Sequence, residues 1–215
     1  MTIVPFDPHK ADANKPPVHP AIAGAPRGSL NVTITYLEMD ERPSGAPLPA
    51  PYKSQVALMR AIEPTVSFYR YLYDTVGGPW LWYERRAMDD TALGNIIADD
   101  QVEILVLYVG GVPAGFAELD CRKPATTDLA YFGLLPEFIG RKLGPFLLDA
   151  AIRRAWDGDI RKLTVNTCTL DHASALTMYQ RAGFKPARQE LKVIKDPRIT
   201  GDIPTDCGAH IPLRD

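Results

Sequence analysis

Hydrophobic and polar positions along the chain follow two different periods. Residues 30–39 (LNVTITYLEM) alternate and are rich in β-branched side chains, which predicts a strand. Residues 65–76 carry apolar side chains at helical spacing, and a Gly-Gly-Pro run ends that predicted helix. A further short helix is expected at 90–98. Residues 103–109 and 112–119 flank a Gly-Gly pair, which predicts a hairpin because glycine accepts the positive φ of a tight turn.

The second half of the chain alternates between strand and helix periods. We expect strands at 127–135 and 163–168, a helix at 143–156 between them, and the last strand or strands within 184–194. Hairpins therefore come first and strand–helix alternation follows. This order predicts an α/β (α+β) fold with a sheet of mixed direction.

Proline is concentrated near the N-terminus, where ten of the 20 prolines precede Tyr52. Residues 1–28 hold few large apolar side chains and are interpreted as a proline-rich arm without a core of its own. That arm could be a disordered leader, or it could wrap the domain or a second subunit of a homodimer. We predict one domain at 29–195 and a tail at 196–215.

Composition narrows the class of protein. With 46% hydrophobic residues in 215, the chain can form a proper core. Its 24 basic and 26 acidic residues give a net charge of −2, which argues against a nucleic-acid partner. No apolar run approaches ~18 residues and the start lacks a secretory pattern, so we expect a cytoplasmic protein without a membrane partner. Three separated cysteines, Cys121, Cys168 and Cys207, suit neither a disulfide framework nor a zinc site.

The segment 131–156 predicts a strand, a loop and a helix. Gly140 and Gly144 bracket Arg141 and Lys142 directly before the helix. Free amides and the macrodipole at a helix N-terminus suit an anionic phosphate, and the two cations add to this. The loop matches neither a P-loop nor a Rossmann fingerprint, and an ordinary strand-to-helix turn is the alternative.

A second segment, 164–184 (TVNTCTLDHASALTMYQRAGF), places Asn166 near the end of a strand. Asp171 is predicted to cap a helix that ends at Ala182, with Gly183 just beyond it. Taken together, the two segments resemble the GNAT superfamily of acyl-CoA-dependent N-acetyltransferases. The resemblance is clear over 104–184 and implies a mostly antiparallel central sheet of about six to seven strands, flanked by helices.

The phosphate loop departs from the family pattern Q/R-x-x-G-x-G/A. The six positions here are 139–144, and only Gly144 matches. Ile139 replaces the first polar residue. Lys142 replaces a glycine, and its β-carbon restricts φ and could crowd a pyrophosphate, unless its ammonium pairs with a phosphate instead.

The resemblance implies acetyl-CoA as co-substrate, no metal, and an amine acceptor that attacks the thioester directly in a ternary complex. Backbone groups at Leu134 and Leu135 would hold the pantetheine arm, and Asn166 would bond the pantetheine or a water. The pyrophosphate would lie on the loop amides, at Gly140, Arg141, Lys142, Leu143 and Gly144. Tyr179 matches the general acid for the CoA sulfur, although its helical spacing also fits a core tyrosine.

The base and the acceptor are less determined by sequence. We predict Glu118, acting through water, as the base; Asp120, Asp128 and His172 are further candidates. The acceptor pocket is predicted at Trp80, Trp82 and Arg85, as an aromatic wall with a cation for an anionic group, and packing of this segment on the sheet is the alternative. A small amine or amino-acid-like acceptor is favoured. A protein lysine or N-terminus, or a non-catalytic CoA-binding module, are the other readings.

Overall fold

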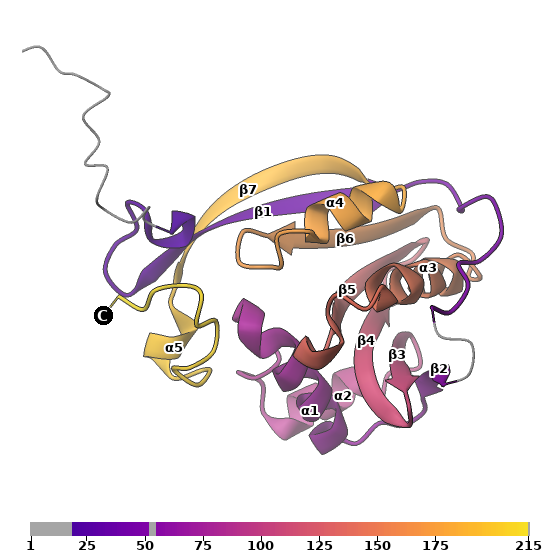
Figure 1. Cartoon of the computed structure of the whole chain (residues 1–215), viewed down its shortest axis with the longest axis horizontal. Helices are drawn as coiled ribbons and strands as arrows, with labels where there is room; N and C mark the ends of the chain where they lie inside the picture. The colour runs from indigo at the N-terminus through magenta and orange to yellow at the C-terminus, as the bar shows by residue number, and fades with distance from the viewer. Residues whose placement is uncertain (1–18, 52–54, 215) are drawn as a thin grey trace, which may run out of the picture.

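Alternating side chains of the central strands place apolar groups on both faces of one sheet. A computed structural model describes residues 19–51 and 55–214. These residues form a seven-stranded sheet in the order β2-β3-β4-β5-β6-β1-β7. All neighbouring pairs are antiparallel except β5 and β6, which are parallel. The predicted fold class, a mixed and mostly antiparallel sheet with flanking helices, is confirmed (Figure 1).

The strands are β1 (Ser29–Met39), β2 (Val56–Ala61), β3 (Val102–Val109), β4 (Val112–Asp120), β5 (Thr126–Leu134), β6 (Lys162–Cys168) and β7 (Lys185–Lys195). The α-helices are α1 (Val66–Gly77), α2 (Asp90–Ile97), α3 (Leu143–Ala155), α4 (Ala175–Arg181) and α5 (Pro197–Thr200). Short 3-10 turns lie at η1 (Pro20–Ile22), η2 (Gly78–Trp80) and η3 (Pro136–Phe138).

Most of the predicted elements are confirmed within one or two residues, including the hairpin of β3 and β4, whose Gly110 and Gly111 both have positive φ. Two differences matter. Strand β2 and helix α5 were not predicted. The prediction that Asp171 caps a helix is wrong: α4 begins at Ala175, and the Asp171 carboxylate accepts hydrogen bonds from Thr167 Oγ1 and the Cys168 amide, both at 2.8 Å.

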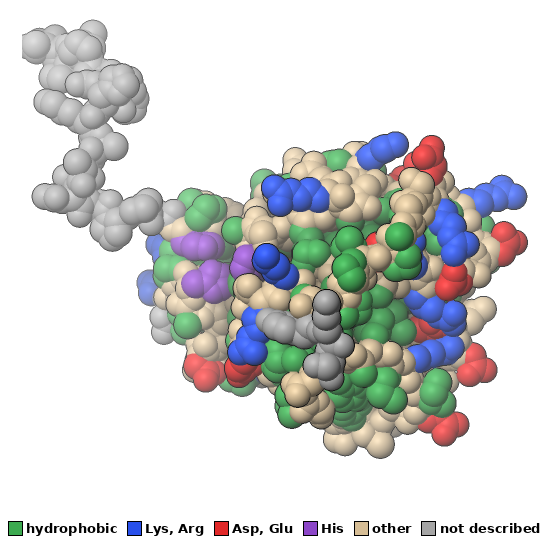
Figure 2. Space-filling model, turned by 45° about the vertical axis from the view of Figure 1, so that its right-hand side comes forward, with side chains coloured by type: hydrophobic (Ala, Val, Ile, Leu, Met, Phe, Trp, Pro, Cys, Tyr) green, Lys and Arg blue, Asp and Glu red, His purple; other side chains and the backbone are tan. Residues whose placement is uncertain are grey.

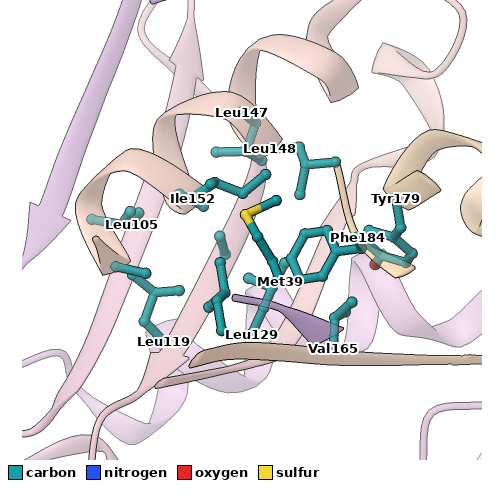
Figure 3. Close-up of a cluster of buried hydrophobic side chains, with 14 of the residues drawn as sticks. Met39, Leu105, Leu119, Leu129, Leu147, Leu148, Ile152, Val165, Tyr179 and Phe184 are labelled. Atoms are coloured by element: carbon teal, nitrogen blue, oxygen red, sulfur yellow. The ribbon is translucent and has the colours of Figure 1, made fainter. Parts of the chain in front are cut away.

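The two faces of the sheet carry different helices. Leu105, Leu119 and Leu129 pack with α3 in the core cluster of Figure 3, which also contains Tyr179 and Phe184. Ile104 and Phe116 point to the opposite face and pack with α1 and α2. The period of two along each strand therefore supplies both cores from the same strands.

One extra residue in β5 changes which side chains reach each face. Glu118 pairs with Tyr131, while Leu119 pairs with Leu129, so Ala130 has no partner in β4. Such a bulge shifts the alternation by one. As a result, Leu129 belongs to the core under α3, whereas Tyr131 packs with the core under α1.

A third cluster joins the two ends of the described chain. Ile22 from the predicted arm packs with Ile203 and Ile211 from the predicted tail, and with Leu30 of β1. Arg198 is buried in an ion pair with Asp196 at 2.7 Å and donates to the Ile211 carbonyl at 2.8 Å. The division into arm, domain and tail stays a prediction, and residues 1–18 of the arm lie outside the described residues.

Candidate active site

The site begins where the two halves of the sheet separate. Strands β5 and β6 pair only from Thr126–Lys162 to Leu129–Val165. Beyond that point the strands diverge, as Figure 1 shows, while β5 stays paired with β4 as far as Leu134. The edge of β5 from Ala130 onward therefore has backbone groups that no strand of the sheet uses.

A cavity of about 1060 Å³ lies at this separation. Its walls include Phe132 and Leu134 from the α3 face, and Trp82 and Tyr131 from the α1 face. The cavity thus reaches both faces of the sheet. An extended ligand could enter along one face and meet a second ligand on the other.

The loop before α3 contains left-handed residues, as do many backbone loops that bind anions. Gly140 has φ +81° and Lys142 has φ +62°, so both lie in the left-handed region. Lys142 immediately precedes α3 and lines the cavity. A family glycine at this position would adopt the same φ without the cost of a β-carbon. Lys142 is exposed and makes no ion pair with any described residue.

The other predicted loop residues divide between cavity and core. Gly144 is buried and lines the cavity, and a Cβ there would meet Met178 Sδ at 3.4 Å. Leu143 is fully buried in the core rather than at the cavity wall. The Arg141 guanidinium lies 4.9 Å from the Phe138 ring centre, outside the cavity lining.

Tyr179 lines the cavity and is also part of the hydrophobic core. Its ring packs edge to face against Phe132 and Phe184, with centroids 6.1 and 5.9 Å away, and Figure 3 shows it beside Phe184. Burial raises the pKa of its hydroxyl, so the phenol stays protonated at neutral pH. No partner for the hydroxyl is found among the described residues. A ligand sulfur or oxygen could therefore accept its proton.

Glu118 does not reach the cavity. Its side chain is fully buried on the α1 face, where one oxygen accepts from Arg85 Nη2 at 2.5 Å and the other accepts from the Tyr69 hydroxyl. Burial raises the pKa of this carboxyl, and the Arg85 charge opposes that rise. The predicted base and the predicted substrate cation are thus each other's partners, and neither lines the cavity. This placement argues against both roles.

The alternative bases are placed as follows. Asp120 is held by Arg122, and Asp128 accepts from Thr164, and neither lines the cavity. His172 does line it, but its Nδ1 accepts from the Ser174 amide at 3.2 Å. A neutral ring with Nδ1 as acceptor carries its proton on Nε2, so it presents a donor at that nitrogen.

Both tryptophans line the cavity, and Trp82 does so from the α1 face. Trp82 packs over Gly77 and lies 5.4 and 5.2 Å from the rings of Tyr73 and Tyr131. Trp80 contacts His172 and His210, with ring centres 5.4 and 5.6 Å away. Trp82 thus lines the cavity and also packs with the core on the sheet, whereas the ring contacts of Trp80 are with two loop histidines.

The predicted residues that line the cavity are Trp80, Trp82, Leu134, Gly140, Lys142, Gly144, Asn166 and Tyr179. Those that do not are Arg85, Glu118, Leu135, Arg141 and Leu143. Leu135 instead donates its amide to the Ala114 carbonyl at 2.9 Å. Sequence reasoning missed Tyr131 and Glu84, which line the cavity, although Glu84 lies inside the aromatic run that drew attention to Trp80 and Trp82.

The described part of the chain carries neither a membrane-spanning helix nor a metal cluster. No helix there is long and apolar enough to cross a membrane. No group of three or more His, Cys, Asp or Glu side chains in that part could hold a metal ion.

Known structures share this architecture at low identity. One is a GCN5-related N-acetyltransferase from Kribbella flavida, with 14% identity and a TM-score of 0.52 over 81% of this chain and 63% of that one. Another, from Sphaerobacter thermophilus, has 13% identity and a TM-score of 0.55 over 79% of this chain and 52% of that one. A conserved protein of unknown function from Staphylococcus epidermidis is also similar (18%, 0.52, 79% and 63%). The chain thus spans about half to two thirds of the length of these proteins, which show the fold alone.

No curated protein matches the sequence. The family model described as "Acetyltransferase (GNAT) family" matches residues 66–184, more than half of the chain and the whole region from α1 to the end of the α4 segment. That span contains the separated strands, the loop before α3 and Tyr179. The chain belongs to the GNAT acetyltransferase family.

Proposed function

We propose that this protein transfers an acetyl group from acetyl-CoA to a primary amine of small-molecule size. One observation carries the proposal. The free edge of β5, the left-handed loop before α3 and Tyr179 all border one cavity that reaches both faces of the sheet. The loop amides and Lys142 would hold the pyrophosphate, and the β5 edge would hold the pantetheine arm as a neighbouring strand.

In this proposal Tyr179 donates a proton to the sulfur as the C–S bond breaks. Burial keeps its hydroxyl protonated, and the neighbouring rings fix its orientation. Phe132 and Leu134 of β5 lie in the same wall, so the thioester would meet the phenol at the strand separation. General acid catalysis of this kind is typically worth ~10²–10⁴-fold.

The amine would attack directly, without an acyl-enzyme. Cys168 is the one cysteine that lines the cavity within the described residues, and burial raises its pKa to about 12. A thiol with that pKa is not a thiolate at neutral pH and is a poor nucleophile. Because Glu118 is held by Arg85 and Tyr69 away from the cavity, water in the cavity is the favoured acceptor of the amine's proton.

The test uses the full chain, acetyl-CoA and a panel of small primary amines, with free thiol as the signal. We expect amine-dependent thiol release, and a fall in kcat of ~10²–10⁴-fold for Tyr179→Phe. Acetyl-CoA affinity and melting temperature should change little, because the substitution keeps the ring. Tyr71→Phe, at an exposed tyrosine on α1, is the matched control.

Two results would contradict the proposal. Acetyl-CoA binding without amine-dependent thiol release would indicate a CoA-binding module instead of an enzyme. A kcat for Tyr179→Phe within about threefold of wild type, with chemistry rate-limiting, would leave Tyr179 as a packing residue.

A further inference from the structure

We call the part of the cavity lined by Trp80, Trp82 and Tyr131 its acceptor side. The aromatic run with Arg85 suggests a positive charge there, but the available charge is negative. Three cations lie in or near this side, and each is already paired. Arg85 pairs with Glu118 at 2.5 Å, and Arg86 pairs with Asp74. Lys192 lies 3.4 Å from Glu190. An anionic group of a substrate could therefore pair with none of these three cations without displacing an existing ion pair.

A carboxylate on the same side is available. Glu84 is exposed, lines the cavity and makes no ion pair with any described residue. Its one hydrogen bond among those residues comes from the Tyr73 hydroxyl at 3.3 Å. Asp171 also lines the cavity and adds a second negative charge, although its carboxylate accepts two hydrogen bonds from β6.

Aromatic side chains line the same cavity as this carboxylate. Trp80, Trp82, Tyr83 and Tyr131 line the cavity together with Glu84. Trp82 and Tyr131 are held by their contacts with each other and with Tyr73, so they form a preformed wall. Aromatic faces attract cations, and a carboxylate beside them adds a charge partner for the same group. This combination favours ammonium over carboxylate ligands.

We propose that the acceptor is a cationic amine, such as an α,ω-diamine, and that Glu84 and the aromatic wall bind a positive group other than the amine that reacts. The reacting amine must be neutral to attack, so the charge recognised at Glu84 belongs to a second group. The inference rests on the proposed function for the reaction, and it identifies the substrate class for the same cavity. It also replaces the anionic, amino-acid-like acceptor that Arg85 had suggested.

The experiment compares three acceptors of equal length: a four-carbon diamine, the matching amino alcohol and the matching amino carboxylate. We measure kcat/KM with acetyl-CoA for wild type and Glu84→Gln. The diamine should exceed the amino alcohol by about tenfold, and Glu84→Gln should reduce that ratio to near one. Glu63→Gln, an exposed glutamate outside the cavity lining, should keep the wild-type ratio.

A binding measurement separates this inference from the reaction itself. Calorimetry with CoA present should show the diamine binding more tightly than the amino alcohol, and Glu84→Gln should abolish the difference, whether or not acetyl transfer occurs. Equal binding of the two compounds, or preference for the amino carboxylate, would overturn the inference. A uniform fall in kcat for all acceptors in Glu84→Gln would also overturn it, because that pattern indicates a base.

Discussion

Lys142 takes a backbone conformation that side chains with a β-carbon rarely adopt. Its φ of +62° and ψ of +16° place it in the left-handed region at the start of α3. This conformation costs roughly 1–2 kcal/mol for a residue with a β-carbon. The chain keeps the geometry of a glycine loop and adds an exposed ammonium at the cavity wall. We infer that the ammonium contributes to ligand binding and that this contribution offsets the cost of the strained backbone.

Two variants separate the strain from the charge. Lys142→Ala and Lys142→Gly both remove the ammonium, so both should weaken acetyl-CoA binding by about tenfold or less, as expected for an exposed cation. Only glycine also relieves the left-handed strain. Lys142→Gly should therefore be more stable than Lys142→Ala by ~0.5–1 kcal/mol in urea unfolding. Equal stability of the two variants would show that the loop does not hold this φ in solution.

Single residues also show what the sequence could and could not predict. Tyr179, Gly144 and Asn166 were predicted because they lie at fixed positions in two contiguous motifs, and the structure places all three at the cavity. Glu118 and Arg85 are 33 residues apart, and no local pattern indicates that they pair. Burial and pairing are tertiary properties, so sequence reasoning assigned separate roles to two halves of one ion pair.

At the scale of elements, the Arg85–Glu118 ion pair and the Tyr69 hydroxyl bound to it join three segments. Glu118 lies on β4, Tyr69 on α1, and Arg85 in the loop that follows η2. The Arg85 guanidinium also lies 5.3 Å from the ring centre of Tyr131 on β5. The pair thereby links the loop of Trp82 and Glu84 to the sheet, and we infer that Glu118 positions this loop.

Removing Glu118 alone should destabilise the fold more than removing Glu118, Arg85 and Tyr69 together. Glu118→Leu leaves a buried guanidinium and a buried hydroxyl without their shared carboxylate, and should lower the free energy of unfolding by ~3–5 kcal/mol. The triple variant with Arg85→Met and Tyr69→Phe removes those groups too, and should recover much of the loss. Urea unfolding measures both. If the triple variant folds as wild type and keeps its KM for the amine but loses kcat by ~10²-fold or more, a base role is indicated instead of a positioning role.

Element prediction failed where the signal is short or where one residue shifts a register. Strand β2 has six residues with a half-exposed pattern, and α5 has only four, so neither gives a clear period. The bulge at Ala130 is a single unpaired residue, yet it turns Tyr131 toward the acceptor side. Alternation alone would have placed Tyr131 on the same face as Leu129.

At the scale of the whole molecule, both ends of the described chain support the acceptor side of the cavity. Residues 19–28 and the segment after α5 share a cluster with Leu81, the residue next to Trp80. The Gly208 amide donates to the Gly78 carbonyl at 3.1 Å, and His210 contacts Trp80. Figure 2 shows histidine side chains gathered on one part of the surface. The described parts of the predicted arm and tail therefore both pack on the cluster that contains Leu81.

If the ends hold η2 in place, weakening their core should affect the acceptor and spare the CoA side. Ile211 is 1% exposed in this cluster, and Ile211→Ala should lower the free energy of unfolding by ~2–5 kcal/mol. We also expect a higher KM for the amine and a nearly unchanged KM for acetyl-CoA, because no residue of the loop before α3 belongs to this cluster. Ile62→Ala, at a side chain 72% exposed, is the control and should leave all three quantities unchanged. Equal rises of both KM values in Ile211→Ala would mean that the cluster stabilises the whole sheet and does not specifically support the acceptor side.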